Sequence, residues 1–155
     1  MVQLVPLEWL KAHEQILMDN FEALLDMTRQ VGSYKKPLVV DKQTGAILDG
    51  HHRYHIGITL GLKSIPAIVI DYMHDDSITV ETWPECGLQE INKADVIRMS
   101  LSPEVYPPKT SRHRIADDLP IIDVPLTILQ HAPLSGVYVA DPDVALCESA
   151  PTPVF

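Results

Sequence analysis

Hydrophobic positions follow two different periods in the first part of the chain. The mostly apolar stretch 2–7 predicts a short first strand, in which Pro6 limits backbone pairing. Between residues 17 and 31, apolar side chains return every three or four positions, which predicts an amphipathic helix. Gly32 directly follows this pattern and is its natural C-terminal stop.

A hairpin and a second helix are predicted next. Residues 37–41 have the composition of a strand, 42–45 that of a tight turn, and 46–48 that of a returning strand. A helix over residues 51–60, closed by Gly61, follows the hairpin. Periodicity alone leaves this helix open, because apolar residues within it also alternate as they would in a strand.

The rest of the chain predicts fewer regular elements. Strands are expected at 65–71 and 77–82, and a helix capped by Asn92 is expected to run to about Leu101. From residue 107 onward the chain carries eight of its thirteen prolines. Apart from a candidate strand at 137–139, we expect the last two dozen residues to be irregular. Without repeats or an interdomain linker, the pattern predicts one α+β domain with a loosely structured tail.

Composition excludes several classes of protein. The 155 residues include 21 acidic and 12 basic side chains, for a formal net charge of −9. Because Lys and Arg supply most nucleic-acid affinity, this balance argues against DNA binding. No apolar run approaches the roughly 18 residues of a membrane span. The N-terminus lacks the pattern of a secretory signal, unless one was already removed. Cys86 and Cys147 are too few for a disulfide framework, so we expect free thiols and a cytoplasmic location, with a single bridge left open.

The positive charge that exists is concentrated in one place. Lys109, Arg112, His113 and Arg114 lie within six residues, whereas no Lys or Arg follows and six acidic residues do. A small positive cluster in a negative chain suits a small anionic ligand better than a polyanion.

The first candidate site is the sequence Asp-Gly-His-His-Arg at positions 49–53. A strand ends there, Gly50 permits a sharp turn, and the first amides of the next helix point outward without internal partners. Arg53 adds a planar donor for phosphate oxygens, and Asp49 suggests either Mg²⁺ or a carboxylate that accepts a substrate proton. Alternatively, Asp49 merely caps the helix and the histidines are surface residues. Zinc binding by His51 and His55 is disfavoured, because the pair lacks an obvious third ligand.

The second candidate site is the segment 106–114, where two prolines precede cations, hydroxyls and an imidazole. Such a mixture suits a carboxylate or a phosphate, although a basic run is more often a solvated surface. Glu14, in the pair His13-Glu14, carries no signal by itself.

Residues 36–72, and the box at 49–53 above all, resemble the core of the ParB/sulfiredoxin superfamily. ParB-type proteins carry Gly-Glu-Arg-Arg at the corresponding box and sulfiredoxins Gly-Cys-His-Arg. Here the box lacks the cysteine of sulfinic-acid reduction, and no helix-turn-helix region follows. The Asp-Gly-His-His-Arg form, together with Pro-Pro-Lys-Thr-Ser-Arg-His at 107–113, is similar to the free serine kinases of this superfamily. The resemblance covers about residues 1–131 and implies one domain with a small mixed sheet flanked by helices, followed by a mostly irregular tail over 132–155.

The resemblance implies transfer of a phosphoryl group from ADP or ATP to free L-serine, with Mg²⁺. Glu14 would be the catalytic base, and Asp49 would join the metal and catalytic centre. The phosphate and nucleotide contacts implied are Gly50, His51, His52, Arg53, Lys109 and Thr110. The serine and product contacts implied are Trp83, Ser111, Arg112, His113 and Arg114. No DNA or membrane partner is expected, and a homo-oligomer is left open.

One departure from the serine kinases keeps a second class of function open. The family's kinases are longer, and here only 23 residues separate Trp83 from Pro107. The short segment between Trp83 and Pro107 favours a ParB-like regulatory module. Such a module would bind or hydrolyse nucleotides but would lack serine kinase activity. The segment at 107–113 favours the kinase.

Overall fold

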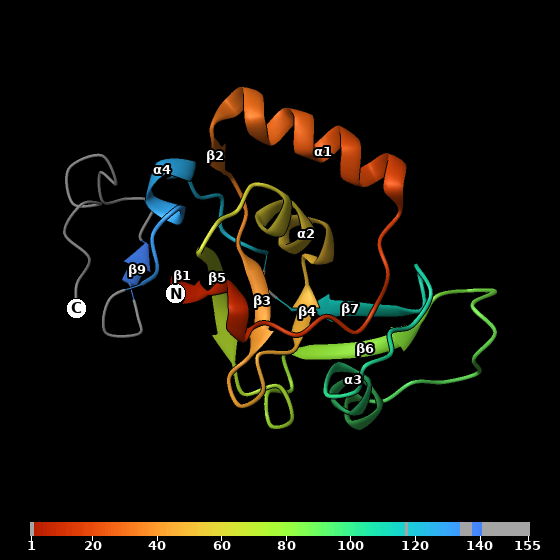
Figure 1. Ribbon diagram of the computed structural model, residues 1–155. Helices are drawn as coiled ribbons and strands as arrows, with labels where there is room; N and C mark the ends of the chain where they lie inside the picture. The colour runs from red at the N-terminus through yellow and green to blue at the C-terminus, as the bar shows by residue number, and fades with distance from the viewer. Residues whose placement is uncertain (1, 117, 134–137, 141–155) are drawn as a thin grey trace.

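The computed structural model describes residues 2–116, 118–133 and 138–140 (Figure 1). Five strands form the central sheet in the order β4-β3-β5-β1-β9. Strand β3 pairs parallel to β5, and the other pairings are antiparallel, so the sheet is mixed. The bounds of these strands are β1 Val2–Pro6, β3 Leu38–Asp41, β4 Ile47–Asp49, β5 Ser64–Ile70 and β9 Tyr138–Ala140.

Helices and two small strand pairs surround this sheet. In Figure 1, α1 lies above α2, and the β6–β7 ribbon extends to the right with α3 below it. The helices are α1 Met18–Val31, α2 His51–Thr59, α3 Lys93–Ser100 and α4 Leu126–Leu129, with a 3-10 turn η1 at Leu7–Trp9. The small pairs are β6 Ile78–Thr82 with β7 Ser111–Ile115, and β2 Ser33–Tyr34 with β8 Val124–Pro125.

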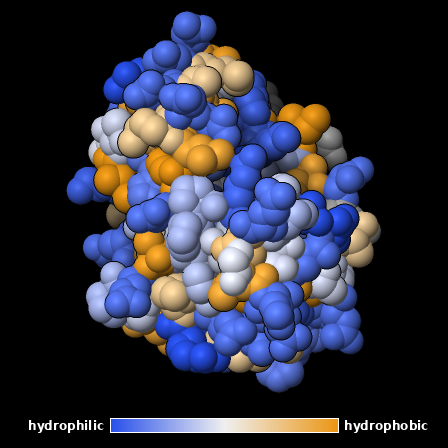
Figure 2. All heavy atoms as spheres, turned by 90° about the vertical axis from the view of Figure 1, so that its right-hand side faces the viewer, coloured by the Kyte–Doolittle hydropathy of each residue, from blue (hydrophilic) through white to orange (hydrophobic). Residues whose placement is uncertain are grey.

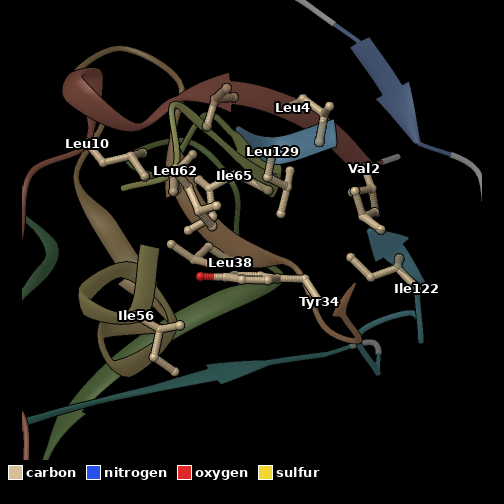
Figure 3. Close-up of a cluster of buried hydrophobic side chains, with 14 of the residues drawn as sticks. Val2, Leu4, Leu10, Tyr34, Leu38, Ile56, Leu62, Ile65, Ile122 and Leu129 are labelled. Carbon is tan, nitrogen blue, oxygen red and sulfur yellow. The ribbon is translucent and has the colours of Figure 1, made fainter. Parts of the chain in front are cut away.

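The larger hydrophobic cluster fills the space between the sheet and α1, α2 and α4. Leu38, Ile56 and Ile65 are fully buried at its centre (Figure 3). Tyr34 lies in the same cluster, and its hydroxyl donates to the backbone oxygen of Arg53 at 2.6 Å. The core of the domain is therefore joined directly to the first turn of α2.

A second, smaller hydrophobic cluster lies between the sheet, the β6–β7 ribbon and α3. Val39, Tyr72, Ile78 and Val96 are its fully buried members. The two clusters give the domain two packed parts, and the segments that carry the candidate site residues meet where these parts adjoin.

Most elements predicted from the sequence are confirmed. The α+β class, the helix ending at Gly32, the hairpin, the strands near 65–71 and 77–82 and the helix capped by Asn92 are all present. The predicted helix over 51–60 is α2, so this segment forms a helix and not the strand that its alternating apolar residues had left open. The first strand ends one residue early, because Leu7 begins a 3-10 turn. The strand left open at 137–139 is observed at 138–140, where it pairs with β1.

The short elements that were not predicted are β2, β8, α4, the 3-10 turn η1 and strand β7. The sequence of β7, Ser-Arg-His-Arg-Ile, has little apolar alternation. Residues 134–137 and 141–155 of the predicted irregular tail lie outside the described residues. Among the described helices, none combines the length and the apolar character that a membrane span requires.

Candidate active site

The segment that carries Glu14 runs beside the segment that carries the second candidate site. The amide of Tyr106 donates to the oxygen of His13 at 2.7 Å, and the amide of Gln15 donates to the oxygen of Tyr106 at 2.8 Å. These two bonds bracket Glu14 and fix its backbone against residue 106. Its side chain is therefore aimed at the loop that follows.

The carboxylate of Glu14 is held in a nest of backbone amides. Its Oε1 accepts from the amides of Ser111 at 2.7 Å and Thr110 at 3.2 Å, and from the Ser111 hydroxyl at 2.8 Å. Among the described residues, its Oε2 accepts only from the amide of Lys109, at 3.2 Å. The left-handed φ of Lys109, +56°, turns these successive amides toward one point, as in other anion-binding nests. Burial raises the pKa of Glu14, and these donors oppose that rise.

The turn into α2 requires a glycine. Gly50 has a φ of +105°, and a Cβ at this position would lie 2.7 Å from Cγ of Leu38. Gly50 is also the N-cap residue, without a side-chain cap, so the alternative in which Asp49 merely caps the helix is wrong. The first amide of α2 with a partner within the helix is that of Tyr54, which donates to Gly50. The preceding amides are positioned to bind an anion.

Arg53 lies close to Asp49, but Asp49 does not occupy all of its hydrogen-bond donors. One terminal nitrogen of Arg53 donates to the oxygen of Pro37 at 3.2 Å and lies 3.4 Å from Oδ2 of Asp49. In the described part of the chain, the buried Nε of Arg53 has no hydrogen-bond partner. The side chain of Asp49 is 47% exposed, so its oxygens remain open to a ligand.

The two histidines of the box bind protein backbone through their side chains. Nε2 of His51 accepts from the amide of His13 at 3.2 Å, and Nε2 of His52 accepts from the amide of Leu17 at 3.2 Å. Burial lowers the pKa of both imidazoles, so they are neutral acceptors at neutral pH. These histidines fasten the Glu14 segment onto α2 through Nε2, and both also line the cavity with the amides of the box and Arg53.

The other predicted residues differ in their orientation. The indole of Trp83 donates to the oxygen of Ser111 at 3.1 Å, and the guanidinium of Arg112 lies 4.6 Å from the Trp83 ring centre. Arg112 and Arg114 both form ion pairs with Glu81 at 2.6 Å. On the opposite face of β7, Nε2 of His113 lies 2.8 Å from the hydroxyl of Tyr72, and burial lowers its pKa to about 3.

A cavity of about 540 Å³ opens between α1, the first turn of α2 and the loop before β7. Figure 2 shows the side of the molecule where the β6–β7 ribbon ends, and its surface is mainly hydrophilic. The predicted site residues that line the cavity are Glu14, Asp49, Gly50, His51, His52, Arg53, Trp83 and Lys109. Those outside its lining are Thr110, Ser111, Arg112, His113 and Arg114.

Sequence reasoning missed one wall of this cavity. Helix α1 contributes Asn20, Leu24 and Met27 to the lining. The amphipathic pattern of α1 predicted only the side that packs on the core, and it gave no signal for residues that face a ligand. The contribution of Gln15 could have been suspected from its place beside Glu14.

The site offers a suitable but incomplete set of Mg²⁺ ligands. No group of three or more potential metal ligands occurs among residues 2–116, 118–133 and 138–140. Mg²⁺ commonly takes only one or two protein carboxylates and completes its shell with water and substrate phosphates. The half-exposed carboxylate of Asp49 at the cavity wall fits that role, whereas Oε1 of Glu14 already accepts three hydrogen bonds from the protein.

Several known proteins are similar in sequence to this chain. No protein-family model matches the chain. A ParB-like protein of Sulfolobus acidocaldarius is 35% identical over 98 residues, which are 60% of this chain and 48% of that protein. The ADP-dependent L-serine kinase SerK of Thermococcus kodakarensis is 35% identical over 93 residues, 57% of this chain and 38% of the kinase. An ATP-dependent L-serine kinase of Staphylothermus marinus is 33% identical over 94 residues, 58% of this chain and 37% of the kinase.

The chain is similar in sequence to L-serine kinases, at 33–35% identity over 52–58% of its length. A free serine kinase solved in complex with AMP superposes with a TM-score of 0.72 and 21% identity, over 81% of this chain and 92% of that chain. The fold of the serine kinases is therefore present. The chain spans half or less of the length of the curated relatives it matches, so their complete activity is not transferred by similarity alone.

Proposed function

We propose that this protein transfers a phosphoryl group from ADP or ATP to free L-serine, forming O-phospho-L-serine. The observation that carries the proposal is the convergence of three distant segments on one cavity. These are the segment of Glu14, the box at 49–53 and the loop ending at Lys109. These segments also resemble the serine kinases. Of the two kinases compared above, the one from Thermococcus kodakarensis is ADP-dependent and the one from Staphylothermus marinus is ATP-dependent.

The phosphate part of the cavity is the first turn of α2. Phosphoryl transfer depends on alignment and on neutralising charge over the equatorial oxygens. The open amides at the start of α2 and the guanidinium of Arg53, which lines the cavity, are suited to these oxygens. In this proposal Asp49 holds Mg²⁺, which would offset the charge of the nucleotide phosphates. The side chains of His51 and His52 act by keeping this turn attached to the Glu14 segment.

The acceptor part of the cavity lies toward Glu14. Oε2 of Glu14 accepts one hydrogen bond, so it is the oxygen with room to accept the serine hydroxyl proton. The serine oxygen then forms its bond to phosphorus while the bond from phosphorus to the nucleotide oxygen breaks. Trp83 and Lys109 line the same cavity and are proposed to contact serine and phosphate. Contacts from Thr110, Arg112, His113 and Arg114 remain predictions.

The proposal is tested by incubating the protein with Mg²⁺ and either ADP or ATP, with and without L-serine. Mass spectrometry should detect phosphoserine only in the presence of serine. Glu14→Gln and Asp49→Asn should each lower the rate by roughly 10²-fold or more, while circular dichroism shows an unchanged fold. Formation of phosphoserine at full rate by Glu14→Gln would refute the assignment of the base.

A nucleotide-binding or nucleotide-hydrolysing module is the second candidate, and the short segment between Trp83 and Pro107 favours it. Both candidates use the box at 49–53, so the box does not separate them. Hydrolysis of the nucleotide at the same rate with and without serine, and without phosphoserine, would establish the module. A screen of other amino acids and hydroxyl acceptors in the same assay would identify a different acceptor.

A further inference from the structure

The side chain of Ser111 lies behind Glu14 and does not line the cavity. Ser111 is 8% exposed, and its hydroxyl is 2.8 Å from Oε1 of Glu14. The same hydroxyl is 2.9 Å from Nε2 of His13, which is fully buried. One hydroxyl therefore connects the proposed base to a buried imidazole.

Two hydrogen bonds join Glu14 to Ser111 and Ser111 to His13. When Glu14 is ionised, only one placement of the hydrogen atoms satisfies both bonds. A carboxylate only accepts, so the single hydroxyl hydrogen of Ser111 must point to Oε1. Nε2 of His13 must then carry its hydrogen and donate to the Ser111 oxygen. Nδ1 of His13 is bare in this tautomer; it has no hydrogen-bond partner among the described residues, and the backbone of Ile47 beside the ring opposes the lowering of its pKa by burial.

His13 is itself fixed on several sides. Its amide donates to His51, and its ring lies edge-to-face with the rings of His51 at 4.6 Å and His113 at 5.9 Å between centroids. The ring of His113 is in turn held by the hydroxyl of Tyr72. A buried imidazole packed in this way has one orientation, and it transmits that orientation through Ser111 to Glu14.

We propose that Ser111 and His13 are positioning residues for Glu14. They hold its Oε1 and leave the less occupied Oε2 for the acceptor hydroxyl. This inference rests on the proposed kinase function and deepens it. It differs from a direct contact between Ser111 and serine, which the resemblance alone would suggest. The two roles predict different kinetics, because a contact with bound serine changes KM, whereas a misplaced base changes kcat.

The test compares Ser111→Ala and Ser111→Thr, with Ser100→Ala as the matched control. Ser100 is also buried, 5% exposed, and its hydroxyl donates to the oxygen of Val96 within α3. We expect Ser111→Ala to lower kcat by roughly tenfold or more, the effect of losing a bond to a charged group, with the KM for serine within about twofold. Threonine keeps the hydroxyl and should restore most of kcat, and Ser100→Ala should match the wild type. A raised KM for serine with unchanged kcat in Ser111→Ala would overturn the inference.

A second pair of variants addresses His13. In His13→Gln the amide nitrogen can replace Nε2 as a donor to Ser111, whereas His13→Leu removes the donor. We expect His13→Leu to lower kcat and His13→Gln to recover part of it. Equal losses in both variants, with both folded, would contradict a role for the donor.

Carbon-13 NMR of the Glu14 carboxyl group tests the same contact without relying on activity or on the His13 variants. Its signal should move in Ser111→Ala and stay near the wild-type position in Ser111→Thr and Ser100→Ala. An unmoved signal in Ser111→Ala would overturn the inference. A wild-type protein that forms no phosphoserine would instead refute the proposed function, and the NMR result would still decide whether Ser111 holds Glu14.

Discussion

The core beneath α2 and the junction around Glu14 are both buried, but they are held together by different forces. The core consists of aliphatic side chains such as Leu38, Ile56 and Ile65, whose packing depends on volume and shape. The junction consists of Glu14, Ser111 and the surrounding histidines, which specific hydrogen bonds join to one another. Loss of a core side chain weakens the whole domain, whereas loss of a junction atom changes the geometry of one site.

The largest expected effect on stability comes from the core. Ile65→Ala removes a fully buried side chain from β5 and should lower the free energy of unfolding by about 2–5 kcal/mol. Ile121→Ala is the matched control, because Ile121 is 75% exposed and should change stability little. Urea denaturation measures both. If Ile65→Ala kept the wild-type midpoint, the distinction between a packed core and the junction would be wrong.

The next effect is expected in activity. Arg53→Lys keeps the charge but loses the planar guanidinium whose Nε is unpartnered, and we expect phosphoserine formation to fall by roughly 10²-fold. Arg98→Lys is the control, since Arg98 is an exposed residue of α3 paired with Asp95. Initial rates, with urea midpoints alongside, measure the effect. Equal rates for Arg53→Lys and the wild type would remove Arg53 from the proposed phosphate site.

A smaller effect is expected in the response of stability to pH. Burial lowers the pKa of His13 from 6.5 to about 4 and that of His113 to about 3. Between these values and 6.5 the unfolded chain binds more protons, so these histidines make stability fall as the pH falls through that window. The raised pKa of Glu14 acts in the opposite sense over the lower part of the window.

Urea denaturation at pH 7 and pH 5 measures this response. His113→Gln should lose less stability between the two values than the wild type does. His74→Gln, which replaces an exposed histidine, should follow the wild type. A response in His113→Gln as steep as that of the wild type would show that the buried histidines do not titrate as their surroundings indicate.

The smallest effect is expected at an exposed polar contact. Lys35 and Asp123 form an ion pair at 2.9 Å with both side chains more than half exposed. Such pairs contribute about 0–1 kcal/mol, so Lys35→Ala should barely change the urea midpoint. A large loss would show that polar contacts outside the junction are also important for the fold.

The sequence predicted the elements whose side chains divide clearly between an apolar and a polar face. Helix α1 belongs to this group, whereas β3, β4 and β5 were predicted from short apolar runs that are buried on both faces; each packs on the larger cluster. Strand β7 could not be predicted in this way. Its backbone is paired with β6, and Arg112 and Arg114 are held by Glu81 more than thirty positions earlier.

The candidate site was predictable only in part, for a related reason. The box at 49–53 could be interpreted locally, because a strand end, a glycine and a helix start are neighbours in the sequence. Glu14 carried no signal of its own, since its amide partners lie 95 to 97 residues later in the chain. Only the resemblance to the serine kinases selected it, and only the structure assigns Ser111 to its far side.

The central claim, that three segments face one phosphoryl group and one serine, is tested most directly with the proposed product. Titration of the isotope-labelled protein with O-phospho-L-serine and Mg²⁺, followed by amide NMR, reports each segment separately. We expect the largest shifts at the amides of residues 51–53 and 109–111 and at the indole of Trp83. Shifts confined to other parts of the domain, or none at saturating ligand, would contradict the account.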